Sequence, residues 1–271
     1  MITPMKLNSF NGVGYGQKAS VTLSVGPTYE EIILMTNLEP SMIKRVSVTL
    51  NAEEIYVLSG AQIKMLEAYK RNTAKSGAFV IPFSDISGKT ANGIRSTALV
   101  TEMGDNILLE VEIGTPADMA TAPAISLQAW AHVSERQPAR ILVPKIKTQS
   151  FQATAQGENE FLNLISGAFI SVRRMHFETD KMTDLRIERD HVKVYESSAD
   201  LAKYQGDRNK RSWQAGFFHY DPLQRGFYLK DLFSTAHNSE LKFTVTTTDP
   251  VGTLPILVES VEVVRPDLLV S

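Results

Sequence analysis

Short stretches of alternating apolar and polar residues recur along the whole chain. Val, Ile, Thr and Phe dominate these stretches, and Gly, Pro, Asp and Asn separate them. Such a pattern is typical of β-strands joined by turns. The strands expected from it are Ala19–Val25, Val46–Leu50, Ile107–Ile113, Phe169–Val172, Leu185–Val194, Leu241–Thr247 and Ile256–Val264. Many short strands of this kind predict an all-β sandwich or barrel.

Only two segments carry apolar residues at helical spacing. They are Ala61–Arg71 and Ala199–Gly206, and the second ends in a glycine, as helices often do. Two isolated helices within a strand pattern do not make a chain of βαβ units. We therefore expect each helix to flank a β-sandwich.

The order of elements repeats between the two halves of the chain. In each half a strand, a turn and a short strand lead to a helix, a basic segment and an aromatic strand. The motif Lys6–Phe10 (KLNSF) also recurs as Lys147–Phe151 (KTQSF). Any two β-domains share strands and turns, and one short motif can recur by chance, so the repeated order carries the argument.

This repeat predicts two tandem domains, residues 1–145 and residues 146–271. About seven or eight antiparallel strands closed as two sheets make a jelly roll. The expected fold is therefore all-β, a double jelly roll in which each β-sandwich has one flanking helix. The boundary is placed near Pro144–Lys147.

Composition narrows the function classes. The 271 residues carry a net charge of −2, so bulk attraction to nucleic acid or to an anionic membrane is not expected. The absence of cysteine removes disulfides, thiolate nucleophiles and Cys-based zinc sites. No apolar run is long enough to span a membrane, and the opening residues do not resemble a secretory signal.

Two glycine-containing segments resemble phosphate-binding loops but lack their context. In Gly12–Gly16 the third glycine comes one place early for a dinucleotide fingerprint, and a strand follows it. Ser87–Thr90 (SGKT) lacks the earlier glycine of a P-loop, because Phe83 occupies that position, and no helix pattern follows Thr90. Both segments are interpreted as loops.

No catalytic or metal-binding motif is found among the histidines and acidic residues. No pair reads His-x-His, and His176, His191 and His219 are expected at partly exposed strand positions. Asp180 and Asp184, with Glu178, could gather a calcium ion but lack EF-hand spacing, and a solvated loop is the simpler interpretation. Paired carboxylates for glycoside hydrolysis cannot be located from sequence. Trp213 is expected in core packing rather than in a nucleic-acid stacking platform.

A basic segment follows each predicted helix. Positive charge at a helix C-terminus is favoured locally by the helix dipole. A matched pair of basic segments in a near-neutral chain also suggests contacts in an assembly, with acidic surfaces of neighbouring copies or with lipid headgroups. The candidate assembly contacts are Lys70, Arg71, Lys75, Arg208, Lys210 and Arg211.

The sequence resembles the major capsid protein of the corticoviruses, which are tailless icosahedral phages with a membrane beneath the coat. The resemblance rests on these stretches in order: Leu7–Ser9, Pro27–Glu30, Pro40–Leu50, Lys64–Lys75, Gly77–Val80, Ile170–Phe177, the helix region Tyr195–Tyr204 and Leu241–Thr246. It weakens around Thr90–Arg95 and Gln205–Arg225, where surface loops vary.

The resemblance implies a double jelly roll that forms trimeric capsomers of nearly hexagonal outline around the membrane. It implies a virion protein made in the host cytoplasm, with neighbouring capsomers and other virion proteins as partners, possible contact with membrane lipids and no specific nucleic acid. Calcium is associated with coats of this family, but no ligand set can be placed here. An alternative hypothesis is a carbohydrate-binding or carbohydrate-active jelly-roll protein.

Overall fold

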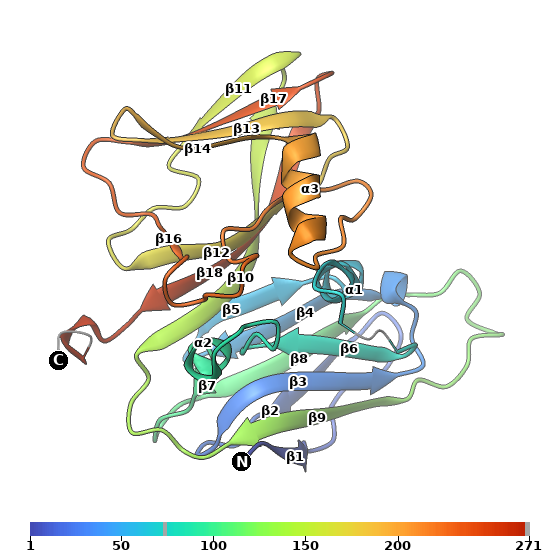
Figure 1. Cartoon of the computed structure of the whole chain (residues 1–271). Coiled ribbons are helices and arrows are strands. Elements are labelled where there is room, and N and C mark those ends of the chain that lie inside the picture. The colour runs from blue at the N-terminus through green and yellow to red at the C-terminus, as the bar shows by residue number, and fades with distance from the viewer. Residues whose placement is uncertain (73–74, 269–271) are drawn as a thin grey trace.

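The alternating segments form strands in two β-sandwiches, which lie one above the other in Figure 1. The computed structural model describes residues 1–72 and 75–268. Within these residues there are 18 strands, and nine of them precede residue 140.

The first sandwich is built from strands β1 to β9. One sheet has the order β1-β9-β3-β6, with β7 beside β3, and the other has the order β2-β8-β4-β5. The strands are β1 (Thr3–Lys6), β2 (Lys18–Thr22), β3 (Thr28–Thr36), β4 (Ile43–Leu50), β5 (Glu53–Leu58), β6 (Ala78–Pro82), β7 (Leu99–Val100), β8 (Ile107–Ile113) and β9 (Leu127–Ser134).

The second sandwich repeats this arrangement strand for strand. One sheet has the order β10-β18-β12-β15, with β16 beside β12, and the other has the order β11-β17-β13-β14. The strands are β10 (Leu142–Ala153), β11 (Gly157–Leu162), β12 (Ile170–Phe177), β13 (Met182–Arg189), β14 (Val192–Ser198), β15 (Phe218–Tyr220), β16 (Phe233–Ser234), β17 (Leu241–Thr247) and β18 (Gly252–Val263). The predicted double jelly roll is therefore confirmed, and each sandwich is called a roll below.

A tight turn lies within the alternating segment Leu185–Val194, where the repeated order of a strand, a turn and a short strand predicted one. β13 and β14 meet at Asp190 and His191, whose φ angles are 50° and 65°. Two consecutive positive φ angles are the geometry of a type I′ hairpin turn. Apolar and polar residues continue to alternate through the turn, so it was the repeat between the two halves, and not the alternation, that indicated it. The first roll has the same turn at the equivalent place, Asn51–Ala52 between β4 and β5.

The two predicted helices lie at equivalent places between the fifth and sixth strands of their rolls. They are α1 (Gly60–Tyr69) and α3 (Ala199–Arg208). Each begins after a serine, Ser59 or Ser198, whose hydroxyl accepts a hydrogen bond from a backbone N–H of the first turn. The repeated order of elements that predicted the duplication is thus a repeated order in space.

The first roll contains a second, shorter helix that the sequence did not predict. α2 (Ala91–Arg95) follows Thr90, whose hydroxyl accepts a hydrogen bond from the N–H of Gly93 at 3.1 Å. A helix of five residues is too short to display a helical period, which is why no pattern was visible after Thr90. Two short 3₁₀ helices, Pro40–Met42 and Pro266–Leu268, complete the described secondary structure.

Strand β10 joins the two rolls. It pairs antiparallel with β18 along its full length, and it also pairs parallel with β5 of the first roll, where Ile146 lies opposite Tyr56. One sheet therefore runs through both rolls, in the order β15-β12-β18-β10-β5-β4-β8-β2. The predicted boundary at Pro144–Lys147 lies within β10.

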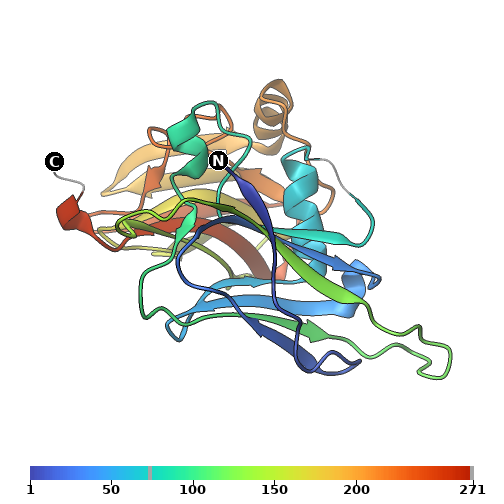
Figure 2. The same ribbon diagram turned by 90° about the horizontal axis from the view of Figure 1, so that it is seen from below.

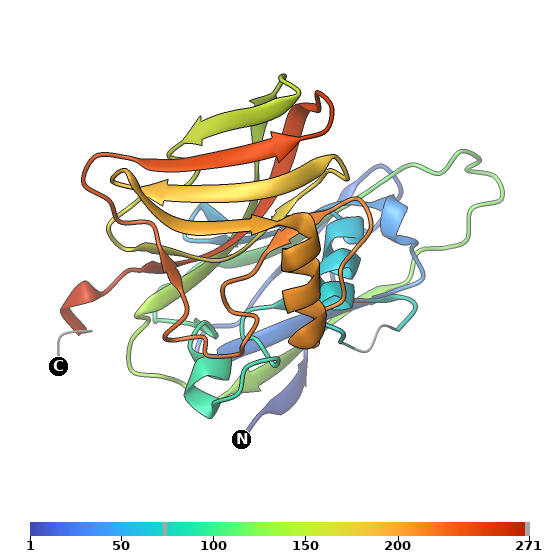
Figure 3. The same cartoon turned by 45° about the horizontal axis from the view of Figure 1, so that its top comes forward.

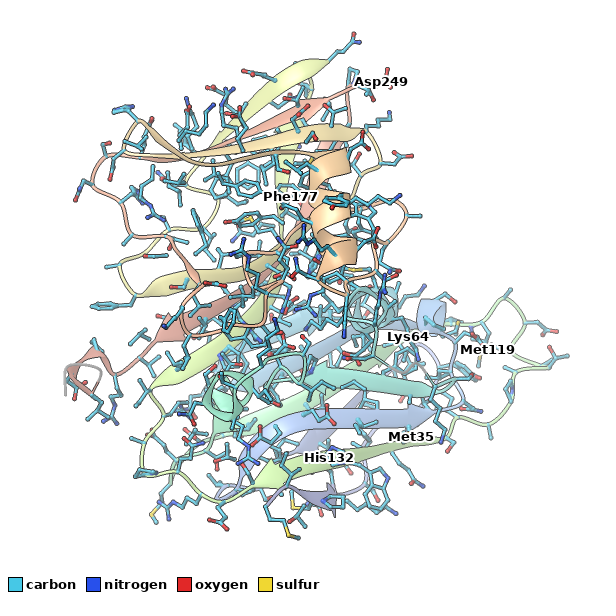
Figure 4. The ribbon with its side chains drawn as sticks, in the orientation of Figure 1. Met35, Lys64, Met119, His132, Phe177 and Asp249 are labelled. Atoms are coloured by element: carbon cyan, nitrogen blue, oxygen red, sulfur yellow. The ribbon has the colours of Figure 1, made fainter. Side chains whose placement is uncertain are left out.

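Each roll has its own apolar core between its two sheets. The first core gathers buried residues from Leu7 to Ile146 together with Leu257 of β18, and the second gathers residues from Ala153 to Val258. Phe177 lies inside the second roll, whereas Met119 lies at the end of the projecting loop between β8 and β9 (Figures 2 and 4). In the part of the chain that the structure describes, no helix is long and apolar enough to cross a membrane.

Candidate assembly site: the charged seam between the rolls

The six basic residues predicted as assembly contacts divide into two groups. Arg71, Lys75, Arg208 and Lys210 are exposed. The prediction of an assembly role stays open for these four.

Lys70 and Arg211 do not fit that prediction, because only 5% and 4% of their surfaces are exposed. Lys70 is the C-terminal cap of α1, and Arg211 lies just beyond α3. Both side chains form buried ion pairs, Lys70 with Glu259 of the other roll and Arg211 with Asp221 of its own roll, so the two residues are internal and not surface contacts.

Arg174 of β12 lies at the centre of these ion pairs and is fully buried. Its Nη1 lies 2.8 Å from Oδ2 of Asp85 and 3.2 Å from Oε2 of Glu259. Its Nε lies 3.1 Å from Oδ2 of Asp221, and its Nη2 donates to the Tyr228 hydroxyl at 3.2 Å. One guanidinium thus contacts three buried carboxylates.

Several of these ion pairs cross from one roll to the other. Asp85, in the loop after β6 of the first roll, also contacts Arg173 of the second roll at 3.4 Å. Lys70 of the first roll contacts Glu259 of β18 at 3.4 Å. Within the second roll, Arg211 contacts Asp221 at 3.2 Å. The inter-roll network is defined as Lys70, Asp85, Arg173, Arg174, Arg211, Asp221 and Glu259.

The charges of the network hold each other ionised. Burial raises the pKa of the Asp85 carboxyl, but Arg174 and Lys70 outweigh that effect and hold the pKa well below its usual range. Burial likewise raises the pKa of Glu259, and the same two cations hold it well below its usual range. Asp85 and Glu259 are therefore anions at neutral pH.

Two buried histidines extend the network. Their burial contradicts the position that the sequence predicted for them. His176 and His219 were expected to be partly exposed, but only 0% and 3% of their surfaces are accessible. They face each other across the pair of strands β12 and β15, with 2.7 Å between their Nδ1 atoms. His191, in contrast, lies exposed in the turn between β13 and β14.

The hydrogen bonds around the histidines assign their protons. The backbone N–H of Gln214 can only donate, so Nε2 of His219 accepts it at 3.2 Å. His219 then donates from Nδ1 to Nδ1 of His176, and His176 donates from Nε2 to Glu259 at 3.1 Å. Both rings are neutral in this chain of bonds. Burial lowers the pKa of His219 to about 2.

The network can fix the orientation of the rolls relative to each other. Its cations and anions are matched with each other at hydrogen-bonding distances and shielded from water. Ion pairs that are fully buried contribute little net stability, but removal of one partner leaves an uncompensated charge. We therefore infer that the network holds the two rolls in one relative orientation.

Sequence reasoning missed most of this network, although one signal was present. Arg173 and Arg174 interrupt the apolar strand β12, and Glu259 interrupts β18. A charged residue inside a buried strand requires a buried partner. The partners could not be named, because Asp85 and Asp221 come from loops that are distant in sequence.

Among residues 1–72 and 75–268, no group of three or more acidic or histidine side chains is placed to hold a metal ion. Calcium binding therefore stays an expectation from the resemblance. The other sequence features are placed as follows. Gly12–Gly16 and Ser87–Thr90 lie in loops, and Trp213 packs edge-on against Phe218, at 5.6 Å between ring centroids.

Solved structures of viral capsid proteins share this fold. The major capsid protein P2 from bacteriophage PM2 matches with a TM-score of 0.86 and 20% identity, covering 97% of this chain and 98% of that chain. The STIV major capsid protein matches with a TM-score of 0.70 and 11% identity, covering 100% and 99%. A PBCV-1 virus capsid structure matches with a TM-score of 0.65 and 10% identity, covering 96% and 94%.

Family models match both rolls. The model of the viral coat protein P2 N-terminal domain matches residues 4–134, and that of the viral coat protein P2 C-terminal domain matches residues 143–264. No curated protein matches the chain. These findings confirm the resemblance drawn from the sequence, and they favour a coat protein over the carbohydrate-active alternative. The chain therefore belongs to the P2 family of viral coat proteins and is a structural protein of the virion capsid, not an enzyme.

Proposed function

We propose that three copies of this coat protein form a capsomer of nearly hexagonal outline, and that these capsomers tile an icosahedral shell around an internal membrane. The observation that carries the proposal is the strand-for-strand correspondence of the two rolls within one chain. Two similar units per chain turn the threefold symmetry of a trimer into approximate sixfold symmetry.

The joint within the chain supports a specific joint between chains. Inside one copy, the edge strand β5 of the first roll meets β10 of the second roll. In the repeat, β5 corresponds to β14, and β10 corresponds to β1. If all six rolls of a ring meet in the same way, β14 of one copy lies beside β1 of the next copy.

Both strands are suited to such a contact because each is the last strand of its sheet. An edge strand has unpaired backbone groups that can pair with another chain. β14 also exposes two apolar residues on one face, Val192 and Val194, with 63% and 43% of their surfaces accessible. A second copy would remove these side chains from water.

The exposed basic residues support contacts beyond the trimer. Arg71, Lys75, Arg208 and Lys210 carry positive charge on the surface of a chain whose net charge is −2. We expect them to face acidic surfaces of neighbouring capsomers or lipid headgroups. Such contacts weaken with salt, since the screening length is about 8 Å at physiological ionic strength.

Light scattering after size exclusion tests the trimer. The mass measured for the pure protein should be three times the chain mass of 30.0 kDa. Obligate interfaces bury more than about 2,000 Å², so a trimer held by such interfaces should stay intact during elution. Val194→Lys should shift the protein to monomer, since it places a charge in the joint. Leu162→Lys is the matched control, because Leu162 is also an exposed strand residue, on the opposite edge strand β11. A monomeric native protein at micromolar concentration would refute the trimer. Equal effects of both variants would refute the joint.

A further inference from the structure

A basic cavity lies where the two helices end, between the rolls. The C-terminal ends of α1 and α3 are close together (Figure 3), and Arg71 there contacts Asp207 at 3.4 Å. The loops after β6 and after β15 close the other sides of the cavity. Its volume is about 660 Å³.

Among the residues that the structure describes, seven cationic side chains and no carboxylate line this cavity. Two of them, Lys70 and Arg211, belong to the buried inter-roll network and form its floor. Five more surround the opening and are exposed to solvent. These rim residues are Arg71, Lys89, Arg208, Lys210 and Arg225.

Most of the rim cations have no anionic partner in the described part of the chain. Arg71 pairs with Asp207, and both side chains are half exposed. For Lys89, Arg208, Lys210 and Arg225, no ion pair is formed with any residue in the described ranges 1–72 and 75–268. The floor charges are already matched by the carboxylates beneath them. The cavity therefore presents an uncompensated positive field to an incoming anion.

The backbone at two rim positions is strained in the same way. Arg71 and Lys210 follow the C-terminal caps of α1 and α3, and their φ angles are 56° and 61°. Glycine or asparagine is usual at this position of a helix end, because a left-handed φ disfavours other side chains. Cationic side chains occupy it in both rolls instead.

The helix dipole does not account for the whole arrangement. It favours cations beside the last turn of α1 and of α3. Lys89 and Arg225, however, come from the loops after β6 and after β15, and no helix C-terminus explains their charge. Convergence of cations from four separate segments points to a ligand with more than one negative charge.

A second hollow of about 520 Å³ adjoins the cavity and shares Lys89, Arg208 and Arg225 with it. Its far wall is apolar and exposed, and it includes Leu201, Tyr204 and Phe227. The pair of hollows thus offers charge on one side and apolar surface on the other.

We propose that the basic cavity is a binding site for a phosphate group, either free phosphate or the phosphate of an anionic lipid headgroup. Arginine and lysine together are the residues that bind phosphate oxygens, arginine through two parallel N–H bonds and lysine as a point charge. A carboxylate side chain would bring only one negative charge to a cavity whose rim carries five exposed cations. The site is formed by one chain, so it does not depend on the proposed trimer.

Calorimetric titration with sodium phosphate, at a constant ionic strength of about 0.15 M, tests the site in the native protein. The test variant is Lys89→Gln with Arg208→Gln, since both residues line both hollows and come from different rolls. Lys44→Gln with Arg136→Gln is the control, because it removes the same charges from exposed positions elsewhere. We expect the test variant to weaken phosphate binding at least about tenfold, and the control to leave it unchanged.

Vesicle sedimentation separates the two sources of phosphate. Phosphatidylcholine vesicles with and without phosphatidylglycerol are compared for the native protein and both double variants. Binding that requires phosphatidylglycerol and is lost only in the test variant identifies a headgroup site, and phosphate binding without vesicle binding identifies a free-phosphate site. Absence of both, or equal loss in the control variant, would overturn the proposal. The proposal would also be overturned if the native protein bound neither probe and the test variant failed to assemble into trimers or shells. The cavity would then be a contact between chains.

Discussion

His219 should contribute to the pH dependence of the free energy of unfolding, and the substitution His219→Gln should remove that contribution. The ring is buried, accepts the N–H of Gln214 and donates to His176, so its native state is neutral. Its pKa in the folded protein is about 2, because burial disfavours the charged form. In the unfolded chain the pKa of the same side chain is near 6.5, the ordinary value for histidine.

The sign and size follow from these two pKa values. Below about pH 6.5 the unfolded chain binds a proton that the native protein does not bind, so acid favours unfolding. The stabilisation from neutral His219 is complete above that pH and is lost as pH falls toward the folded pKa. The loss is about 1.4 kcal/mol per pH unit, or about 2 kcal/mol between pH 6.5 and pH 5.

Urea unfolding at fixed protein concentration, followed by tryptophan fluorescence at several pH values between about 7 and 5, measures this slope. Trp213 is a local reporter, because its ring centroid lies 5.0 Å from that of His219. His219→Gln should reduce the slope by about 1.4 kcal/mol per pH unit relative to the native protein. Glu67, whose pKa burial raises, contributes with the opposite sign but is present in both proteins and cancels.

His191→Asn is the control for that experiment, because His191 is exposed in a turn whose left-handed backbone asparagine accepts. It should leave the slope unchanged. A His219→Gln protein with the native slope would show that His219 is charged or titrates normally in the fold, and the assigned chain of neutral histidines would be wrong.

Three substitutions test other features through the free energy of unfolding. Asp85→Asn should lower the free energy of unfolding by about 3–5 kcal/mol, because it leaves buried cations of both rolls unpaired. Asp118→Asn, at an exposed carboxylate, should change it little. Equally small effects of both variants would show that the network does not hold the rolls together. Gly77→Ala should destabilise strongly, because a Cβ there would lie 2.3 Å from the Thr36 carbonyl oxygen; Gly26→Ala has a positive φ but open space, and should cost only about 1–2 kcal/mol. Ser59→Ala should cost about 1 kcal/mol, because the N–H of Gln62 loses its acceptor at the start of α1, and no change would indicate that water accepts this N–H instead.

The sequence predicted the parts of the fold that have a local period. β8 and β17 have the bounds expected from alternation alone, since their inner faces are apolar and their outer faces are polar. The equivalence of α1 and α3 was also visible, because helix, basic segment and aromatic strand follow each other in both halves. The turn at Asp190–His191 was indicated only by the repeat between the halves, since a hairpin reverses the chain without breaking the alternation.

For the site, the sequence predicted the types of some residues but not their burial or their positions. The basic segments after the helices were identified, but burial of Lys70 and exposure of Arg71 depend on contacts made by the other roll. Lys89 and Arg225 lie in loops without any pattern, so their place on the same cavity could not be foreseen. Pairing between β12 and β15 brings His176 and His219 together, and no spacing along the chain encodes that distance.

The shared strand β10 has a consequence for the order in which the chain folds during synthesis. When β10 leaves the ribosome, every strand of the first roll has already been made, so β10 can dock on β5 and present its other edge. The strand that covers that edge, β18, begins about 100 residues later, a delay of roughly 5–20 s at cellular rates of elongation. The second roll therefore grows on a template supplied by the first, and it closes only when β18 inserts between β10 and β12. During that interval the nascent chain has an open edge, the period in which it is most prone to pair with another copy.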